Sequence, residues 1–517
     1  MGAIRKSRVG FARIKPLDAI LANAQRHSLH RSLGALQLMM LGVGGTIGTG
    51  IFVLTAEAAQ KAGPGMLVSF VISGMVCAVG ALCYSELAAM VPVAGSAYTY
   101  TYAVMGELLA WLVGWALVLE YAVSASAVAV GWSGYFAGQL HGWFGIDLSP
   151  ALMNGPFEGG VMNVPAVIVS LLVTGLLIRG TTESARANTF LVGIKVAALT
   201  VFAILALPAM RMEHFTPFLP LGWASGDGAG VVGAAASIFF AYIGFDAVST
   251  AAEETRDPQR NVPLGLIGSL AICTIFYLLV AAGATGSPLG SQPVMSAGGE
   301  WLSPGSTELA ERCTAIVAAG AREPLACSHE ALAHVLRELG YLHVGNLVGL
   351  AAFLALPSVI LVMIYGQARM FFVMSRDGLL PQRFSAVHPK WRTPHVITAI
   401  TGIGVTVGAA FFPVGKLADI TNAGTLFAFV AVAISVLVLR HTDPTRHRPF
   451  RTPWIWAVAP LTVIGCVILY WRLPYDAKMV LPVWGGIGLL VYFGYGYRKS
   501  RLAHHEVADI SVAETPP

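Results

Sequence analysis

Apolar residues run along this chain in long, evenly spaced stretches that short polar connections interrupt. Each stretch holds about 18 or more mostly apolar residues, which as a helix can cross about 30 Å of hydrocarbon. The pattern predicts an all-α polytopic membrane protein with twelve membrane-spanning helices, at 36–57, 65–90, 103–131, 162–179, 186–208, 230–251, 263–284, 346–375, 395–412, 419–440, 453–470 and 479–497.

The basic residues predict how this bundle lies in the membrane. Of the 517 residues, 56% are hydrophobic and 11% are charged, whereas about 25% are charged in an average soluble protein. Most of the 32 Lys and Arg residues fall in alternate connections and in the two tails, 1–35 and 498–517. The positive-inside rule therefore places both tails in the cytoplasm. The net charge of +5 follows from this topology, so we expect no binding of nucleic acid.

The first predicted span contains the sequence VGGTIGTGIF, Val43 to Phe52, with four glycines. Gly44 and Gly48 form a GxxxG pair, which is typical of close helix packing. The same glycines also favour an unwound segment at Ile47–Gly48–Thr49–Gly50, because glycine destabilises a helix interior by about 1 kcal/mol. A break at this depth is tolerated only where protein or a polar cavity satisfies the freed backbone groups. It also creates a helix N-terminus that attracts a carboxylate.

A second interrupted span decides between these alternatives. FFAYIGFDAVST, residues 239–250, combines Gly244 with Asp246 inside an apolar stretch. Paired broken helices in corresponding positions of two halves indicate a transporter site at the midplane of the membrane. We therefore expect two inverted halves, 36–208 and 230–440, with two peripheral helices in 453–497.

Several longer motifs resemble one protein family. They are GTIGTGIF at 45–52, GPG at 63–65, YSELAAMVPVAGSAYTYTY at 84–102, FFAYIGFDAVSTAAEETRDPQRNVP at 239–263, MSRDGLLP at 374–381, DITNAGTLFAFV at 419–430 and RPFRTP at 448–453. Together they resemble the amino acid–polyamine–organocation superfamily, most closely its bacterial members related to cationic amino acid transporters. The resemblance implies a LeuT-like fold, a five-plus-five inverted repeat with two added helices, in a bacterial plasma membrane.

The resemblance also implies a binding site for an amino acid between the two broken helices. The carboxylate and part of the amino group would lie against Thr46, Ile47, Gly48, Thr49, Gly50 and Ile51. Backbone carbonyls of Phe240, Ala241 and Ile243 would bind the ammonium group, with the Phe240 ring as a gate. Such backbone contacts read the zwitterion that all amino acids share, so the sequence leaves open whether the substrate is cationic or small and neutral.

Three charged residues, Glu120, Lys195 and Asp246, fall well inside predicted spans. A charge at a helix centre costs roughly 2.5–3.5 kcal/mol on insertion scales, so such residues are functional candidates. A structural ion pair between Lys195 and Glu120 is the alternative. In proton-coupled relatives a lysine on the fifth helix takes the place of sodium, which implies that Lys195 couples transport to protons. The other acids lie near predicted helix ends, where we interpret them as caps or loop anchors: Glu57, Glu86, Glu107, Glu253 and Glu254.

The long connection at 285–345 has no counterpart in the resemblance. It holds Cys313 and Cys327, which form either a disulfide on the oxidising side of the membrane or two free thiols. Its HEALAH sequence places histidines five residues apart rather than the four of a zinc-protease helix, so no metal site is expected. The segment from Ala331 to Leu342 predicts an amphipathic surface helix. The sequence leaves open an accessory role for this connection or a partner, either a small membrane protein or a lipid.

These observations favour a secondary transporter that imports an L-amino acid with protons, the proton being the coupling ion and no other cofactor being required. An amino acid exchanger and a membrane amino acid sensor remain alternatives. An enzyme is disfavoured because no Walker motif and no nucleophile–base pair is found.

Overall fold

The computed structural model describes residues 13–17, 20, 33–93, 95–180, 185–226, 228–391 and 393–504. All regular elements among these residues are helices, with isolated bridges but no β-strand. Most of the basic residues of the predicted N-terminal tail, and residues 505–517 of the C-terminal tail, lie outside the described residues. The predicted all-α membrane fold is confirmed.

Nine helices among the described residues are long and apolar enough to cross a membrane: Leu54–Met90, Glu107–Phe144, Asn188–Ala206, Gly230–Thr250, Pro258–Gly286, Leu342–Arg376, Val414–Thr442, Ile455–Arg472 and Tyr475–Lys499. Three shorter apolar helices, Ala35–Thr46, Val164–Ile178 and His395–Phe411, coincide with the remaining predicted spans.

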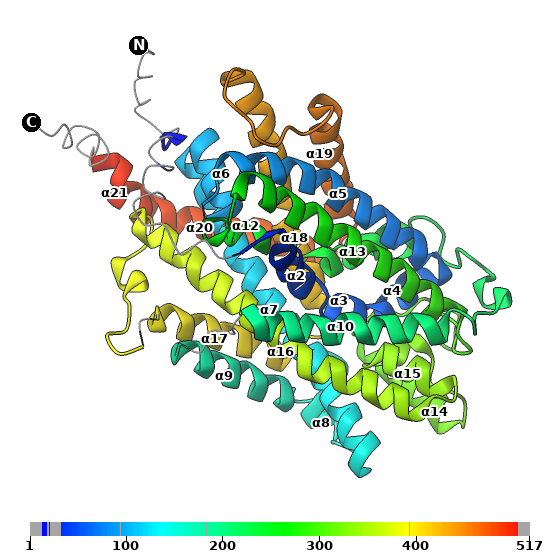
Figure 1. Cartoon of the computed structure of the whole chain (residues 1–517). Coiled ribbons are helices and arrows are strands. Elements are labelled where there is room, and N and C mark those ends of the chain that lie inside the picture. The colour runs from blue at the N-terminus through cyan, green and yellow to red at the C-terminus, as the bar shows by residue number, and fades with distance from the viewer. Residues whose placement is uncertain are drawn as a thin grey trace, which may run out of the picture.

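The helices form one bundle with two distinct ends (Figure 1). Helices α6 (Ser96–Val104) and α21 (Tyr497–Lys499) lie at one end, which we call the tail face. Helices α8 (Pro150–Met153), α14 (Thr307–Ala318) and α15 (Ala331–Glu338) lie at the other, which we call the disulfide face.

At the centre of the bundle, α7 (Glu107–Phe144) packs against α16 (Leu342–Arg376) and α18 (Val414–Thr442). Helix α13 (Pro258–Gly286) packs against α2 (Ala35–Thr46) and α5 (Met66–Met90), and α17 (His395–Phe411) packs against α9 (Val164–Ile178). The helices α19 (Ile455–Arg472) and α20 (Tyr475–Val491) expose many of their apolar side chains, among them Trp456 and Leu490. That exposure is expected where a helix faces lipid.

Several predicted spans have wrong boundaries, including the third and the first. The span predicted at 103–131 is the helix α7, which begins at Glu107 and continues to Phe144, while α6 is a separate helix. Gly106 separates them because its φ of 98° lies in the region that favours glycine. The first span continues to Ala62 rather than ending at 57, because α4 (Leu54–Ala62) buries its charged side chains.

The connection between α13 and α16 folds as a cap on the disulfide face. Cys313 and Cys327 are joined by a disulfide with a Cα–Cα distance of 5.8 Å, and they pack on a small apolar cluster that includes Leu302 and Leu309. The cap is fastened to α4 by Gln60, whose side-chain amide donates to the carbonyls of Val294 and Leu302 at 2.8 Å.

The prediction of a surface helix in this connection is wrong. Residues 331–336 of α15 are buried, because this helix packs against α16. Its charges are paired, with Glu330 bound to Arg337 at 2.5 Å. Burial raises the pKa of the Glu330 carboxyl, and Arg337 beside it opposes that rise.

Candidate functional site

The first predicted span is broken where its glycines are densest. Helix α2 ends at Thr46, Ile47 is extended with φ −73° and ψ 94°, and Gly48 has φ −144° and ψ −148°. The helical backbone resumes at Thr49 in α3 (Thr49–Phe52) and continues into α4. The break is therefore shorter than expected, and Thr49 and Gly50 belong to a first helical turn, whose N–H groups have no partner within the helix.

The second interrupted span is also broken in the structure. Helix α11 (Gly230–Ile238) tightens into the 3₁₀ turn η4 (Phe239–Tyr242), Ile243 is extended, and α12 (Ala247–Thr250) begins after three more residues. Gly244 has φ +111°, which a residue with a side chain rarely adopts. The Asp246 carboxylate accepts a hydrogen bond from the Gly244 N–H at 3.3 Å, so Asp246 stabilises this break.

The two breaks lie against each other, backbone to backbone. A Cβ atom on Gly50 would lie 2.6 Å from the Cβ of Ala241 and closer still to its Cα. A Cβ atom on Gly244 would lie 2.6 Å from the carbonyl carbon of Gly45. Glycine is required at both positions because any side chain would separate the segments.

A small cavity lies at this crossing, with about 10 Å³ open to the centre of a water molecule, which is room for roughly one water. Eleven residues line it: Gly45, Thr46, Gly48, Thr49, Gly50, Ser124, Val128, Phe240, Ile243, Val359 and Met363. Six of the nine residues predicted for the substrate site are in this set, and Ile47, Ile51 and Ala241 are not. The remaining five residues were missed by the sequence analysis: Gly45 on α2, Ser124 and Val128 on α7, and Val359 and Met363 on α16.

Two hydroxyl groups at the cavity lack hydrogen-bond partners. Thr46 and Thr49 are 3% and 0% exposed, and within the described part of the chain neither Oγ1 atom has a partner. Buried polar groups in folded proteins are nearly always hydrogen-bonded, so an unpaired one requires an explanation. A polar ligand bound at the crossing would supply the missing partners.

Tyr277 on α13 connects the two broken helices. Its hydroxyl lies 2.8 Å from the carbonyl oxygen of Thr46 and 2.7 Å from that of Ala241. A hydroxyl has one proton, so it donates to one of these carbonyls at a time. The Ala241 carbonyl, which the resemblance implies for the ammonium group, thus shares this donor with the Thr46 carbonyl.

The three buried charges predicted for coupling lie in different parts of the bundle. The Lys195 ammonium group, on α10 (Ala185–Ala206), donates to the Gly44 carbonyl at 2.9 Å. Gly44 belongs to the last turn of α2, where carbonyls lack helical partners and a cation is favoured. Asp246 lies in the second break, and Glu120 packs against α18 at Gly424. The Thr425 hydroxyl on α18 lies near the Glu120 carboxylate, but neither carboxylate oxygen has a partner of good hydrogen-bond geometry among the described residues.

A fourth group of buried charges was missed. Glu57, interpreted above as a helix cap or loop anchor, is 9% exposed and forms an ion pair with Lys61. Lys61 also forms an ion pair with Asp419 on α18. The interpretation of Glu57 was wrong. The hydropathy pattern places the end of the first span at Glu57, whereas α4 continues to Ala62 and buries Glu57 and Lys61 as an ion pair.

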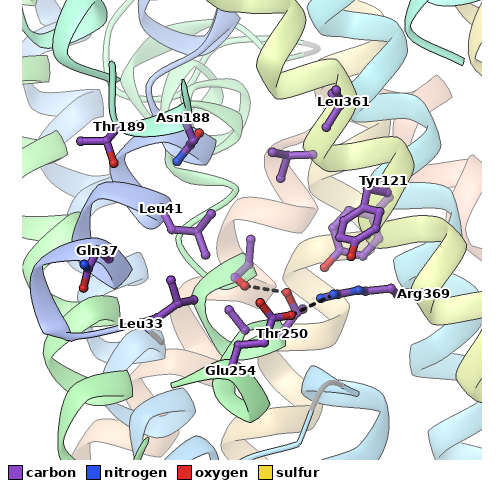
Figure 2. A pocket seen from close by; sticks show the side chains of 15 residues that line it. Leu33, Gln37, Leu41, Tyr121, Asn188, Thr189, Thr250, Glu254, Leu361 and Arg369 are labelled. Atoms are coloured by element: carbon purple, nitrogen blue, oxygen red, sulfur yellow. Dashed lines mark hydrogen bonds and ion pairs between the residues drawn. The ribbon is translucent and has the colours of Figure 1, made fainter. Parts of the chain in front are cut away.

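A larger cavity of about 310 Å³ lies between α2, α10, α12 and α16 (Figure 2). Arg369 crosses it to form an ion pair with Glu254 at 3.1 Å, and its guanidinium stacks 4.3 Å from the centre of the Tyr365 ring. Glu254 therefore lies at a helix end, as predicted, but it is part of a contact between α16 and the segment after α12.

Comparison with known proteins gives a consistent result. The family described as "Amino acid permease" matches residues 33–491 of the chain. The chain is 40% identical over 491 residues to "Branched-chain amino acid permease BcaP" of Bacillus subtilis (strain 168), which covers 94% of this chain and 97% of that protein. It is 38% identical over 493 residues to "Methylthioribose transporter" of the same organism, covering 95% and 98%. It is 34% identical over 438 residues to "Cationic amino acid transporter 4, vacuolar" of Arabidopsis thaliana, covering 84% and 68%.

Proposed function

The chain belongs to the amino acid permease family, and from this membership we propose that it imports an amino acid together with protons by alternating access. It is a membrane transport protein rather than an enzyme. The observation that carries the proposal is the crossing of two broken helices around the unpaired hydroxyls of Thr46 and Thr49. The start of α3 suits a carboxylate, and the unwound carbonyls near Ile243 suit an ammonium group.

We propose an amino acid with an apolar side chain, such as isoleucine, as the substrate. The side chains of Val128, Val359 and Met363 line the cavity together with those of Phe240 and Ile243, and none of these five carries a charge. A relative named for branched-chain amino acids supports this choice, whereas another relative is named for cationic amino acids.

The size of the cavity supports a transport cycle with moving helices. About 10 Å³ is far smaller than an amino acid, so α3 and η4 must separate from α7 and α16 when substrate binds. Movement of this kind fits two halves, 36–208 and 230–440, that rock against each other, with 453–497 at the periphery.

Lys195 is the residue that we propose to couple protons to this movement. Its ammonium group holds the end of α2 through Gly44, and loss of its proton would remove the charge that the helix end favours. Glu120 and Asp246 are the proposed proton partners. Glu120 is fully buried, no oppositely charged group forms an ion pair with it among the described residues, and burying an unpaired charge is costly.

We propose that the tail face is cytoplasmic in a bacterial plasma membrane. The basic residues gather in the connections and tails of that face as the positive-inside rule expects. A disulfide between Cys313 and Cys327 on the opposite face fits an oxidising exterior.

The experiment is uptake by purified protein in proteoliposomes, with labelled isoleucine, arginine and methylthioribose. We expect isoleucine to accumulate with an inward proton gradient and to be released when a protonophore collapses it. Isoleucine counterflow without accumulation would identify an exchanger, and isoleucine binding without flux would identify a sensor.

A second candidate substrate, methylthioribose, rests on the relative of that name, which the chain covers almost completely. Uptake of methylthioribose without uptake of isoleucine would replace the amino acid proposal with this one.

A further inference from the structure

We propose that Glu57, Lys61 and Asp419 form a reversible lock that closes the transport pathway on the disulfide face. The inference rests on the proposed alternating access, because a lock has a purpose only if that face opens. It concerns neither the substrate site nor the residues proposed to couple protons.

The lock joins three helices through one lysine. The Lys61 ammonium group on α4 lies 2.7 Å from a carboxylate oxygen of Glu57 and 3.0 Å from one of Asp419 on α18. Ser237, at the end of α11, donates a hydrogen bond to Asp419 and accepts one from Lys61. The side chains of Lys61, Glu57 and Asp419 are 3%, 8% and 5% exposed, so water screens these contacts little.

The two carboxylates differ in what happens when α4 moves. Glu57 precedes Lys61 by one helical turn on α4, so their ion pair moves with the helix as a unit. Asp419 belongs to α18, so its contact with Lys61 must break when α4 and α18 separate. Removing one partner of a buried ion pair is strongly destabilising because a charge is left uncompensated. Glu57 keeps the Lys61 charge compensated after the contact with Asp419 breaks. The contact between Lys61 and Asp419 can therefore break and form repeatedly.

The lock lies beside a cavity on the disulfide face. That cavity, about 580 Å³ under the disulfide-closed cap, is lined by Val53, Ala56 and Glu57 as well as by residues of the cap. Val53 directly follows α3, whose first turn lines the substrate cavity. Helix α4 packs on α11 and α18, so its movement away from them would open the substrate cavity toward this face.

The position of α18 against Glu57 is also specific. A Cβ atom on Gly415, in the first turn of α18, would lie 2.5 Å from the Glu57 carboxylate carbon. The glycine therefore lets α18 approach the lock closely enough for Asp419 to reach Lys61. When α4 moves away, the Asp419 carboxylate would face the cavity and be hydrated.

The test measures opening without any substrate, so its outcome does not depend on which solute is carried. Val128→Cys places a thiol at the substrate cavity, at a position on α7 that is 2% exposed in this closed structure. Its rate of reaction with a membrane-impermeant methanethiosulfonate, added from the disulfide face, reports how often that face is open. The protein without this substitution gives the background, because the free cysteines among the described residues are buried.

The lock predicts opposite effects for its two carboxylates. Asp419→Asn removes the contact between helices while Glu57 still neutralises Lys61, so the reaction should become at least about tenfold faster, which corresponds to about 1.4 kcal/mol in the conformational equilibrium. Glu57→Gln leaves Lys61 without a partner whenever the face opens, so the reaction should become slower. Asp476→Asn is the matched control. It breaks the ion pair between Asp476 on α20 and Lys416 on α18, which is more exposed and does not involve α4. This variant should leave the labelling rate unchanged.

The same direction of change in Asp419→Asn and Glu57→Gln would overturn the proposal, because loosened packing accelerates labelling in both. Unchanged rates in both would also overturn it. The expected opposite changes in a protein that carries no isoleucine would leave the lock in place and refute only the proposed substrate.

Discussion

Replacement of Gly50 by alanine is the sharpest test of the proposed substrate site. The new Cβ atom would lie 2.6 Å from the Cβ of Ala241. Ordinary contact begins near 3.4 Å, so α3 and η4 must separate by about 0.8 Å or more at their crossing. Overpacking of this kind costs typically 1–3 kcal/mol. If substrate binds only when the two segments meet, the same energy appears as roughly 5- to 150-fold weaker binding, since 1.4 kcal/mol is tenfold.

The matched control is Gly193→Ala on α10, which is not among the residues that line the cavity. A Cβ atom on Gly193 meets nothing within 4 Å, so the added methyl group fits without displacing the backbone. Substrate affinity of the purified proteins would be measured by isothermal titration calorimetry, after size-exclusion chromatography has shown that both variants are folded. We expect weaker binding in Gly50→Ala alone. Equal affinities in the two variants would return Gly50 to a packing role and refute the reasoning.

Three further predictions follow from individual contacts. Lys195→Ala removes the cation that binds the Gly44 carbonyl, so accumulation driven by a proton gradient should be lost in proteoliposomes while some substrate binding remains; accumulation that persists would make Lys195 structural. Tyr277→Phe removes the hydroxyl between the Thr46 and Ala241 carbonyls. Leaving a buried acceptor unpaired should lower the free energy of unfolding by about 1–3 kcal/mol, which would be measured as a lower melting temperature without substrate. An unchanged melting temperature would contradict this prediction. Replacing both Cys313 and Cys327 by serine should lower thermal stability but leave uptake largely intact, because the disulfide lies in the cap rather than at the crossing; loss of uptake at normal expression would show that the cap acts in transport.

The breaks were predictable from sequence because their cause is local. Gly48 and Gly244 stand inside apolar stretches where glycine weakens a helix, and Asp246 follows the second break closely. The helices themselves were predictable for the same reason, since apolar length alone defines a membrane span. Their ends were less predictable where a helix continues beyond the membrane, as α7 does to Phe144.

Contacts between distant segments were not predictable. Nothing in the sequence distinguishes Val359 and Met363 from the other apolar residues of α16, and only the packing of that helix brings them to the cavity. Lys61 was overlooked because its partner Asp419 lies 358 residues away in sequence. A hydropathy pattern places the end of a span at the first charged residue. The folded chain can nevertheless bury that residue when another helix supplies the opposite charge.

The attachment of the disulfide-closed cap to α4 has a pharmacological consequence. Both the side chain and the backbone of Gln60 bind the cap. The side-chain amide donates to the carbonyls of Val294 and Leu302, and the backbone carbonyl accepts a hydrogen bond from the Trp301 indole at 2.8 Å. An antibody fragment that bound the cap and restrained it would therefore restrain α4 as well. Such a reagent would act as a non-competitive inhibitor from the disulfide face, lowering the maximal rate of transport without occupying the proposed substrate site.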